Sequence, residues 1–541
     1  MSSDSRRALL WAWIAVALIL VGVAMVRLRL VDLPLDRDEG EYAYFGQLLL
    51  RGNPPYAAAY NFKMPGIYLV YAAMLAALGQ TPTAIHVGLL IANAVAIALM
   101  FLVGRRLIGT VGGVAASAAY ATLALSPRLF SPSAYAEHFV VVPVLLGVLM
   151  VTRPSGLRPM ALLGAGALFG AAFLVKQSGG AFALLGLVCV LARVRSDARS
   201  RLMAGSVFVA GTLTPFAVLC PLLLAAGTFG SFWFWTFTYA YHYGTGESLA
   251  RGASNLWAAL ASILPTCYLT VALSALGLSA VAWDRAARSR FVPIGLLLVS
   301  GLIGTSAGLY FRNQYFILLL PAVALLAGLA VDAVTRRLAV GAGPSVRAAL
   351  AVVLTAVPFL HLLYLERAIL FTATPRQVGR ALYGMNPFPE AVEIGRYLKE
   401  RTTFDDRIAV VGSEPEIYFY AQRRGATGFV YTYALMEPQP YAAAMQQAMM
   451  REIEAGDPRF VVFVRVWTSW LLRAESDQAI FRWFDEYQKR FERVGIVDII
   501  SPGQTRYLWG EAAAAYTPVT DRWIAVYQRR ATPATDERTR P

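Results

Sequence analysis

Two adjoining stretches near the start of this 541-residue chain decide its fold: Leu9–Val26 (LLWAWIAVALILVGVAMV) and Asp36–Glu41 (DRDEGE). The first is a nearly unbroken apolar run, and about 20 such residues in a helix span a bilayer. The second places four carboxylates within six residues, just after that run. Charges beside a bilayer are costly and commonly mark functional sites. The pair therefore predicts a membrane protein with chemistry at one membrane face.

The composition supports this interpretation, because 57% of the residues are hydrophobic and only 15% are charged. Such values exclude an ordinary soluble protein and fit a chain with many spans. Residues 1–366 hold 25 Lys or Arg against 12 Asp or Glu, whereas residues 367–541 are nearly balanced. The basic excess thus belongs to the membrane part, where it faces anionic lipid headgroups. Nucleic acid is not an expected partner.

The apolar runs predict eleven spanning helices, centred near residues 18, 94, 121, 142, 168, 186, 213, 270, 300, 323 and 356. Arginine clusters alternate between helix ends, and the positive-inside rule places the N-terminus in the cytoplasm. An odd number of spans then puts the C-terminal region outside. The three cysteines lie in apolar runs, which indicates buried thiols rather than disulfides or metal ligands.

The predicted fold is an α-helical polytopic membrane protein with a C-terminal extracytoplasmic α/β domain. Residues 1–366 form the membrane domain, and its first outer loop, 31–83, carries two short interfacial helices. Residues 367–530 form the α/β domain, and residues 531–541 form a disordered tail. In the α/β domain we expect strands at Asp406–Gly412, Gly428–Tyr433, Phe460–Val466 and Trp523–Gln528, and helices at 389–401, 440–455 and 475–493.

Asp38 and Glu39 are the first candidates for chemistry. A carboxylate that is partly desolvated near a bilayer gains basicity, and a positioned carboxylate can take the proton of a hydroxyl nucleophile. The alternative is a solvated loop that starts a helix, because acids favour helix N-termini. We interpret Asp36 and Glu41 as structural, the first as a loop or cap carboxylate.

Three cations on the predicted outer side are candidate phosphate ligands: Lys63, Lys176 and Arg312. Lys63 precedes a Pro-Gly turn, and its simpler interpretation is nonspecific binding of headgroups. Lys176 divides two apolar runs, where it marks either a ligand site or a tight hairpin. Arg312 lies among tyrosines, including Tyr315, which are also typical of interfacial anchoring.

Glu137 is the only acid between residues 42 and 196, and it opens the fourth predicted span. It either faces a water-filled cavity or serves as a helix cap or as a buried partner for an arginine. The loop Phe232–Ser248 (FWFWTFTYAYHYGTGES) contains His242 and many aromatic residues. These residues either contact a substrate or form an interfacial belt. No GxGxxG, Walker A, HExxH or paired CxxC motif occurs, so ATP-driven and zinc-protease functions are unsupported.

Several motifs together resemble the bacterial polyprenyl-phosphate-sugar glycosyltransferases of the GT-C fold, a group that includes lipid A aminoarabinose transferases and protein O-mannosyltransferases. The early motifs are Asp38-Glu39-x-x-Tyr42-Ala43, Leu48–Tyr56 (LLLRGNPPY) and Lys63-x-Pro65-Gly66-x-Tyr68. The later ones are Leu174-x-Lys176-Gln177-x-Gly179 and Arg312-x-x-Tyr315 with Leu320-Pro321. The resemblance covers residues 8 to about 335. Two features depart from it: Met64 replaces a usual proline, and Ala57–Ala59 stand where an acid is often found.

The resemblance implies inverting transfer of a sugar from an isoprenoid phosphate carrier to an envelope glycan, lipid or protein. Asp38 would be the base or orient the acceptor hydroxyl, with Glu39 beside it. Lys63 would bind phosphate, supported by Lys176 and Arg312, while Glu137, Tyr315, Tyr42 and His242 would contact substrate. The expected location is the bacterial inner membrane, among membrane lipids.

Two other function classes stay open. A lipid or solute transporter would use the acids to relay protons, although it predicts charges near the bilayer midplane. A non-catalytic envelope assembly protein would tolerate replacement of Asp38 and Lys63. No cofactor is expected, although Asp38, Glu39 and Glu137 are candidate ligands for a divalent cation such as Mg²⁺ or Mn²⁺.

Overall fold

The computed structural model describes residues 3–154, 158–194, 197–338, 341 and 343–530. The chain divides into two compact units. Unit 1 comprises Met1–Leu33 and Phe62–Val378, and unit 2 comprises Pro34–Asn61 and Gly379–Pro541. The segment with the acidic cluster, which the sequence analysis grouped with the membrane part, therefore folds with the C-terminal residues. The predicted disordered tail, 531–541, lies outside the described residues.

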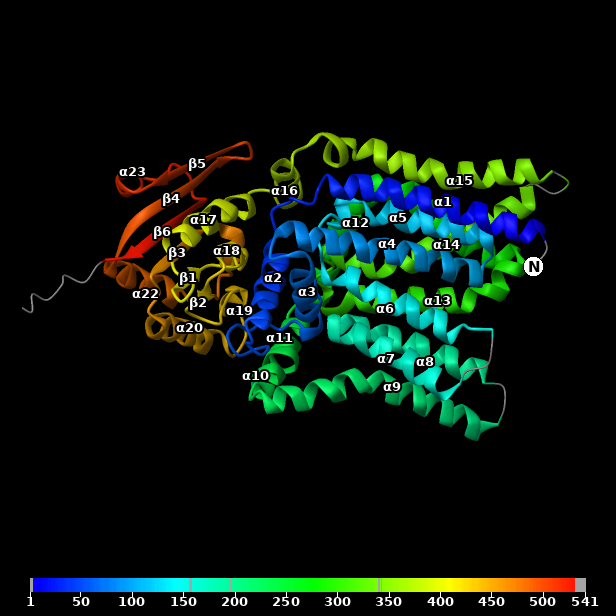
Figure 1. The fold of residues 1–541 in the computed structure, drawn as a ribbon, viewed down its shortest axis with the longest axis horizontal. Helices are drawn as coiled ribbons and strands as arrows, with labels where there is room; N and C mark the ends of the chain where they lie inside the picture. The colour runs from blue at the N-terminus through cyan, green and yellow to red at the C-terminus, as the bar shows by residue number, and fades with distance from the viewer. Residues whose placement is uncertain (1–2, 155–157, 195–196, 339–340, 342, 531–541) are drawn as a thin grey trace, which may run out of the picture. The chain divides into compact units, whose positions relative to one another are not determined.

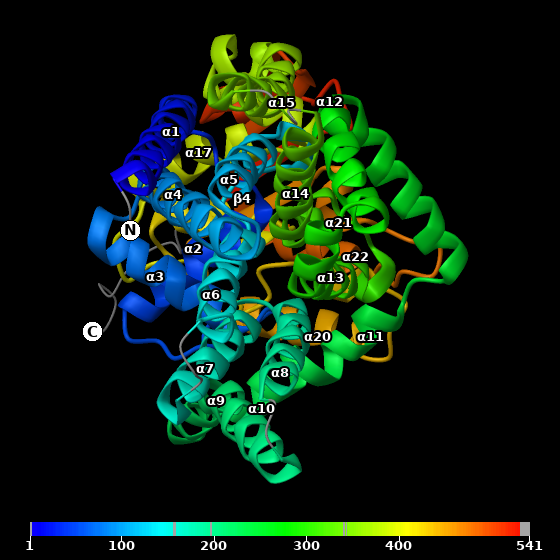
Figure 2. The same ribbon diagram turned by 90° about the vertical axis from the view of Figure 1, so that its right-hand side faces the viewer.

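Unit 1 is a bundle of helices, seen from the side in Figure 1 and along the bundle in Figure 2. Its longer helices are α1 (Ser3–Leu28), α3 (Pro65–Leu78), α4 (Pro82–Leu107), α5 (Thr110–Ala124), α6 (Ala136–Val151), α7 (Pro159–Val175), α8 (Ala181–Arg193), α9 (Ala198–Ala225), α12 (Leu249–Trp283), α13 (Arg285–Ser306), α14 (Leu320–Leu338) and α15 (Pro344–Leu365). The helix α16 (Pro375–Tyr383) contains the boundary between the units.

The many-spanning helical fold is confirmed. Within the described ranges, seven helices are long and apolar enough to cross a membrane, and five more apolar helices have 10–17 residues. All eleven predicted centres fall inside these helices. The remaining apolar helix is α3, which the sequence analysis predicted to lie at the membrane surface. Length and hydropathy identify such helices locally, which explains why the sequence sufficed.

The bundle has a buried centre and an apolar periphery. In the segment that contains α14, 83% of the most apolar stretch is buried, whereas the figure for α15 is 6%. Small residues let helices approach closely, as membrane helices commonly do. A Cβ on Gly328 would lie 2.3 Å from the Gly112 carbonyl oxygen, and one on Gly277 would lie 1.9 Å from that of Leu326. The exposed apolar side chains of α15 are suited to lipid.

The aromatic stretch Phe232–Ser248 is largely helical rather than the predicted loop. It continues from α10 (Phe229–Trp233) through a π-helix, η3 (Phe234–Tyr239), into α11 (Ala240–Thr245). Rings one turn apart stabilise this conformation, since Trp233 stacks on Phe237 with centroids 4.5 Å apart. The sequence analysis predicted a loop here because the stretch lies between two predicted spans, and this position does not distinguish a loop from short helices.

Unit 2 is an α/β unit around a six-stranded sheet with the order β2-β1-β3-β6-β4-β5 (Figure 1). The strands are β1 (Arg407–Val411), β2 (Arg424–Gly425), β3 (Phe460–Arg465), β4 (Phe491–Ser501), β5 (Gln504–Trp509) and β6 (Trp523–Arg529). β1 pairs in parallel with β2 and β3, and β6 lies antiparallel between β3 and β4. The helices are α2 (Arg37–Leu50), α17 (Phe388–Arg401), α18 (Glu416–Ala421), α19 (Tyr433–Met436), α20 (Ala442–Gly456), α21 (Trp467–Trp470), α22 (Ala479–Tyr487) and α23 (Glu511–Ala515).

Most predicted elements of this unit are confirmed, one strand is wrong, and one helix is shorter than predicted. Gly428–Tyr433 is not a strand, because polar side chains replace ladder bonds there: the Gly428 amide donates to Glu452 at 2.9 Å. The helix predicted at 475–493 is the shorter α22, after which the chain enters β4. The β4–β5 hairpin was missed, although Pro502-Gly503 between two apolar runs signals a turn.

Candidate functional site

The acidic cluster begins α2, and two of its carboxylates build the start of that helix. Asp36 is the N-cap residue and accepts a hydrogen bond from the Glu39 amide at 2.8 Å. Glu39 returns the contact by accepting from the Asp36 amide at 3.3 Å, which completes a capping box. Both side chains are buried. The structural interpretation of Asp36 is confirmed, and Glu39 is part of the same cap.

The other two carboxylates of the cluster differ in accessibility. Glu41 is fully buried and accepts from the Asn61 side chain at 2.8 Å. Asp38 is the one carboxylate of Asp36–Glu41 that is not buried, and it accepts from the Tyr431 hydroxyl at 2.9 Å. A carboxylate offers about four lone-pair sites. Asp38 is therefore the most accessible carboxylate of the cluster.

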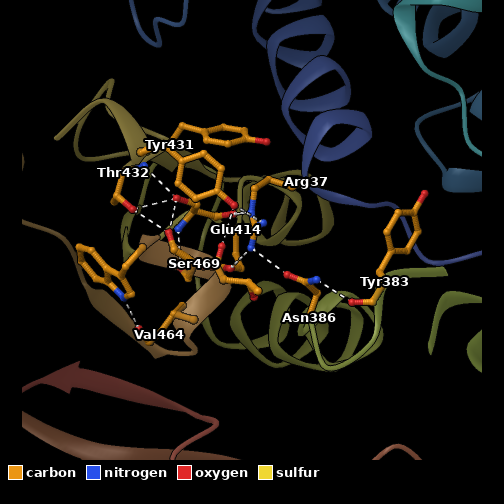
Figure 3. A network of polar contacts seen from close by, with 12 residues as sticks. Arg37, Tyr383, Asn386, Glu414, Tyr431, Thr432, Val464 and Ser469 are labelled. Carbon is orange, nitrogen blue, oxygen red and sulfur yellow. Dashed lines mark hydrogen bonds and ion pairs between the residues drawn. The ribbon is translucent and has the colours of Figure 1, made fainter. Parts of the chain in front are cut away.

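Arg37 lies inside the acidic cluster and anchors the first turn of α2, as Figure 3 shows. The side chain is buried and carries a cation that needs partners. It donates to four groups: the Ser413 carbonyl, the Tyr433 hydroxyl at 2.6 Å, the Asn386 side-chain oxygen at 3.3 Å and the Glu414 carboxylate at 2.9 Å. Burial lowers the pKa of Arg37, but Tyr433 and Glu414 outweigh burial and raise it above its ordinary value.

The sheet explains why these partners meet. Ser413 and Glu414 follow β1, and Ser469 follows β3, which runs parallel to β1. The carboxyl ends of parallel strands lie at one edge of a sheet, where ligands commonly bind. Ser469 donates to the second Glu414 oxygen at 2.7 Å and accepts from the Ser413 amide at 2.8 Å. Glu414 is thus held through both oxygens, and α2 is fixed to this edge.

A further buried carboxylate, Glu416, lies beside α2. The helix approaches so closely that a Cβ on Gly40 would lie 2.5 Å from the Glu416 Cβ. Burial and the neighbouring Glu414 raise the pKa of Glu416 well above its usual value, although Arg37 opposes this. The protonated form of Glu416 is therefore favoured in the folded unit.

In unit 1, three predicted site residues are in direct contact. The Lys176 ammonium pairs with the buried Glu137 carboxylate at 2.5 Å. It also lies 4.1 Å from the centre of the Tyr315 ring, within the range of a cation–π interaction. Lys176 is the C-cap of α7, and Glu137 lies in the first turn of α6. Glu137 is thus the partner of a lysine, whereas the sequence analysis named an arginine as its possible partner.

Lys63 is positioned by the start of α3. Pro65 is the first residue of this helix, and Gly66 packs so tightly that a Cβ there would lie 2.3 Å from the Leu174 carbonyl oxygen at the end of α7. In addition, the Gln177 side chain donates to the Phe62 carbonyl at 2.6 Å. The loop that carries Lys63 is therefore fixed to the segment that carries Lys176.

Aromatic contacts connect this loop to Arg312. Phe62 stacks on Tyr243 with centroids 4.5 Å apart, and Tyr243 stacks on Tyr310 at 4.4 Å. The Arg312 guanidinium lies 5.9 Å from the Tyr310 ring. The segments that carry Lys63, Lys176 and Arg312 are thus connected through Phe62 in unit 1, and we call these three residues the cation cluster. His242 precedes Tyr243 and is half-buried.

The remaining predicted site residues, Asp38, Glu39 and Tyr42, belong to unit 2, and Tyr42 is buried in α2. Sequence reasoning missed Arg37, Glu414 and Tyr431. The placement of Arg37 between acids was a usable signal, whereas Tyr431 is 393 residues from Asp38 and gave none. Within the part of the chain that the structure describes, no group of three or more His, Cys, Asp or Glu is arranged to hold a metal ion.

No protein-family model and no curated protein sequence matches the chain. Solved structures do match. ArnT from Cupriavidus metallidurans bound to undecaprenyl phosphate aligns with a TM-score of 0.54 and 17% identity, over 84% of this chain and 93% of that chain. The same protein in the apo state aligns with a TM-score of 0.52 and 15% identity, over 94% of this chain and 97% of that chain.

The archaeal oligosaccharyltransferase AglB from Archaeoglobus fulgidus, in complex with an inhibitory peptide and a dolichol-phosphate, gives a TM-score of 0.51. Its identity is 12%, over 93% of this chain and 74% of that chain. At these identities the likeness concerns the fold, and it covers most of the chain. The protein is therefore a multi-pass membrane protein with the GT-C fold that ArnT and AglB share.

Proposed function

We propose that the protein is an integral membrane glycosyltransferase that moves a monosaccharide from a polyprenyl-phosphate carrier to an envelope glycan, lipid or protein. The proposed location is the extracytoplasmic side of the bacterial inner membrane. The observation that carries the proposal is the cation cluster, in which polar and aromatic contacts join the segments that carry Lys63, Lys176 and Arg312. Structures with this fold were solved with undecaprenyl phosphate and with a dolichol-phosphate, which supports a phosphate-bearing carrier as ligand.

The cation cluster suits a leaving phosphate. When the bond between the anomeric carbon and the phosphate oxygen breaks, negative charge grows on that oxygen, and fixed cations stabilise it. The first turn of α3, next to Lys63, adds the partial positive charge of a helix N-terminus. Glu137 acts as a positioning residue, because its ion pair directs the Lys176 ammonium. The Tyr315 ring also contacts the Lys176 ammonium through its face and so restricts the position of that cation.

Asp38 is the proposed base. The acceptor hydroxyl oxygen attacks the anomeric carbon opposite the phosphate, its proton passes to Asp38, and the configuration inverts. Tyr431 donates to one Asp38 oxygen and thereby orients the carboxylate, whose oxygens can each accept more than one hydrogen bond. Glu39, predicted as a second catalytic carboxylate, is proposed instead to keep Asp38 in place through the cap of α2. Tyr42 and His242 are proposed to shape the substrate sites of their respective units.

The test is transfer of radiolabelled sugar from polyprenyl phosphate to envelope acceptors in membranes from a deletion strain. Wild type, Asp38→Asn and the control Asp405→Asn are compared at equal expression, since Asp405 is an exposed acid of the same unit. Loss of a general base lowers the rate about 10²–10⁴-fold. We expect this loss for Asp38→Asn alone. Normal transfer by Asp38→Asn would refute its role, and absence of transfer by wild type with several donor sugars would refute the function. Parallel reactions with EDTA measure any contribution of a divalent cation.

A further inference from the structure

A pocket of ≈ 930 Å³ opens in unit 2 beyond the carboxyl end of β3. Its walls come from this end of β3, from α21 and α22, from the start of β6 and from the turn Tyr383–Asn386. Ligands of open α/β sheets commonly bind at this edge. The volume falls in the range of small-molecule sites. None of the residues predicted from the sequence as site residues lines this pocket.

The pocket is lined with aromatic rings, and one of them is unusually accessible. Trp467, at the start of α21, is 66% exposed, so its ring is accessible from solvent. Below it, Trp470 packs on Phe481 with centroids 4.5 Å apart and donates to the Val464 carbonyl at 2.8 Å. The floor is therefore rigid, while the face of Trp467 stays available to a ligand.

The polar lining carries balanced charge. The lining contains two arginines, Arg465 and Arg522, and two aspartates, Asp485 and Asp521. Amides such as Gln478 add hydrogen-bond donors and acceptors. A site for phosphate or a polyanion would show an excess of cations, as the cation cluster does. Flat aromatic faces beside neutral hydrogen-bonding groups suit a ligand with apolar faces and many hydroxyl groups, which is the chemistry of a sugar ring.

The walls of the pocket are hydrogen-bonded to Arg37 and Tyr433, and Figure 3 shows the bond between Asn386 and Arg37. The Thr468 carbonyl accepts from the Tyr433 hydroxyl at 2.6 Å, and Asn386 accepts from Arg37 at 3.3 Å. Tyr433 also packs edge-on against Tyr431, with centroids 5.1 Å apart. Tyr431 in turn donates to Asp38. A ligand in the pocket is thus held by the same rigid group of residues that positions the proposed base.

We propose that this pocket binds a neutral saccharide of the acceptor, stacked on Trp467. The inference rests on the proposed glycosyl transfer, because the pocket would then hold the acceptor for reaction near Asp38. It narrows the acceptor from glycan, lipid or protein to a molecule that carries a neutral glycan. It also predicts that specificity for the acceptor lies in unit 2, whereas the phosphate carrier contacts unit 1.

The test measures binding and transfer separately with the full-length protein in nanodiscs. Mannotriose, chitotriose and maltotriose serve as neutral probes, and inorganic phosphate serves as the charged probe, each titrated by calorimetry. The variants are Trp467→Ala and Gln478→Ala, and the control is Trp257→Ala, which removes an exposed tryptophan of unit 1. We expect one trisaccharide or more to bind wild type and Trp257→Ala, with at least tenfold weaker binding by Trp467→Ala.

In the transfer assay, Trp467→Ala should need at least tenfold more envelope fraction for half-maximal transfer, with the maximal rate retained. Gln478→Ala gives the same test if Trp467→Ala does not fold. Binding of no trisaccharide by wild type, equal binding by Trp467→Ala, or tighter binding of phosphate at the pocket would each overturn the proposal. If wild type transfers no sugar, the proposed function fails, while the binding measurements still decide the role of the pocket.

Discussion

Arg37→Met tests whether the buried ion pair holds α2 in unit 2. The substitution keeps an unbranched side chain but removes the guanidinium and its four hydrogen bonds. Glu414 stays behind with a side chain that is 0% exposed, and Glu416 is buried nearby. Water cannot replace the lost cation at such a position.

The expected cost follows from this burial. Removal of one partner from a buried ion pair destabilises a protein by about 3–5 kcal/mol, because the other charge is left uncompensated. For a unit of this size, 1 kcal/mol lowers the melting temperature by about 2–4 °C, so a fall of about 6–20 °C is expected. The same change should release the first turn of α2 and with it Asp38.

The assay is a thermal ramp of the full-length protein in detergent, with brief thermolysin digestion at each temperature and detection of a C-terminal tag. Arg396→Met is the matched control, since Arg396 is 61% exposed and pairs with surface acids of α17. Surface pairs contribute about 0–1 kcal/mol, so its melting temperature should stay close to that of wild type. The double variant Arg37→Met/Glu414→Gln should recover part of the loss. Arg37→Met melting within 2 °C of its control, or no recovery in the double variant, would refute the reasoning.

Three further predictions concern other contacts. Lys176→Gln should destabilise unit 1 by about 3–5 kcal/mol, because it leaves Glu137 buried without its cation, and it should lower the rate of sugar transfer about 10²-fold. The double variant Lys176→Gln/Glu137→Gln should regain the melting temperature but not the transfer rate. Recovery of both would argue against a role of Lys176 in phosphate binding. Gly66→Ala should destabilise unit 1 by about 1–3 kcal/mol through overpacking, whereas Gly230→Ala, with open space around it, is the control in the same thermal ramp. In wild type, the raised pKa of Glu416 should lower stability as pH rises above about 4.3, because the carboxyl ionises in the unfolded chain while it keeps its proton in the folded unit. Glu416→Gln should remove this pH dependence. Parallel profiles of melting temperature against pH for the two proteins between pH 4 and 7 would contradict the prediction.

The sequence predicted the parts of the molecule that depend on local pattern. Apolar runs located the helices of unit 1, and buried runs such as Phe460–Val466 located strands, because hydropathy and β-propensity act over a few residues. The cap of α2 was also readable, since its two partners are three residues apart. The same local view could not separate a helix from a loop in the aromatic stretch.

Features that depend on distant partners were not predictable. Arg37 meets Glu414 across 377 residues, and this long-range contact is what joins α2 to the C-terminal unit. Nothing in the residues around Asp38 shows which of its neighbours will be buried, so the sequence presented Asp38 and Glu39 as equivalent. The pocket beyond β3 likewise arises from segments between residues 383 and 527 that meet only in the folded sheet.

The division of the chain into units also sets an order of assembly. Unit 2 needs both Pro34–Asn61 and the residues after Gly379, and all of Phe62–Val378 is synthesised between them. At about 5–20 residues per second, translation of that intervening stretch takes about 15–60 s. During this interval Arg37 lacks the Ser413 carbonyl and the Glu414 carboxylate, and the start of α2 has no sheet edge to bind. The proposed base is therefore set in place last, after the helices of unit 1 have been made, so that an incomplete chain carries no working acceptor site.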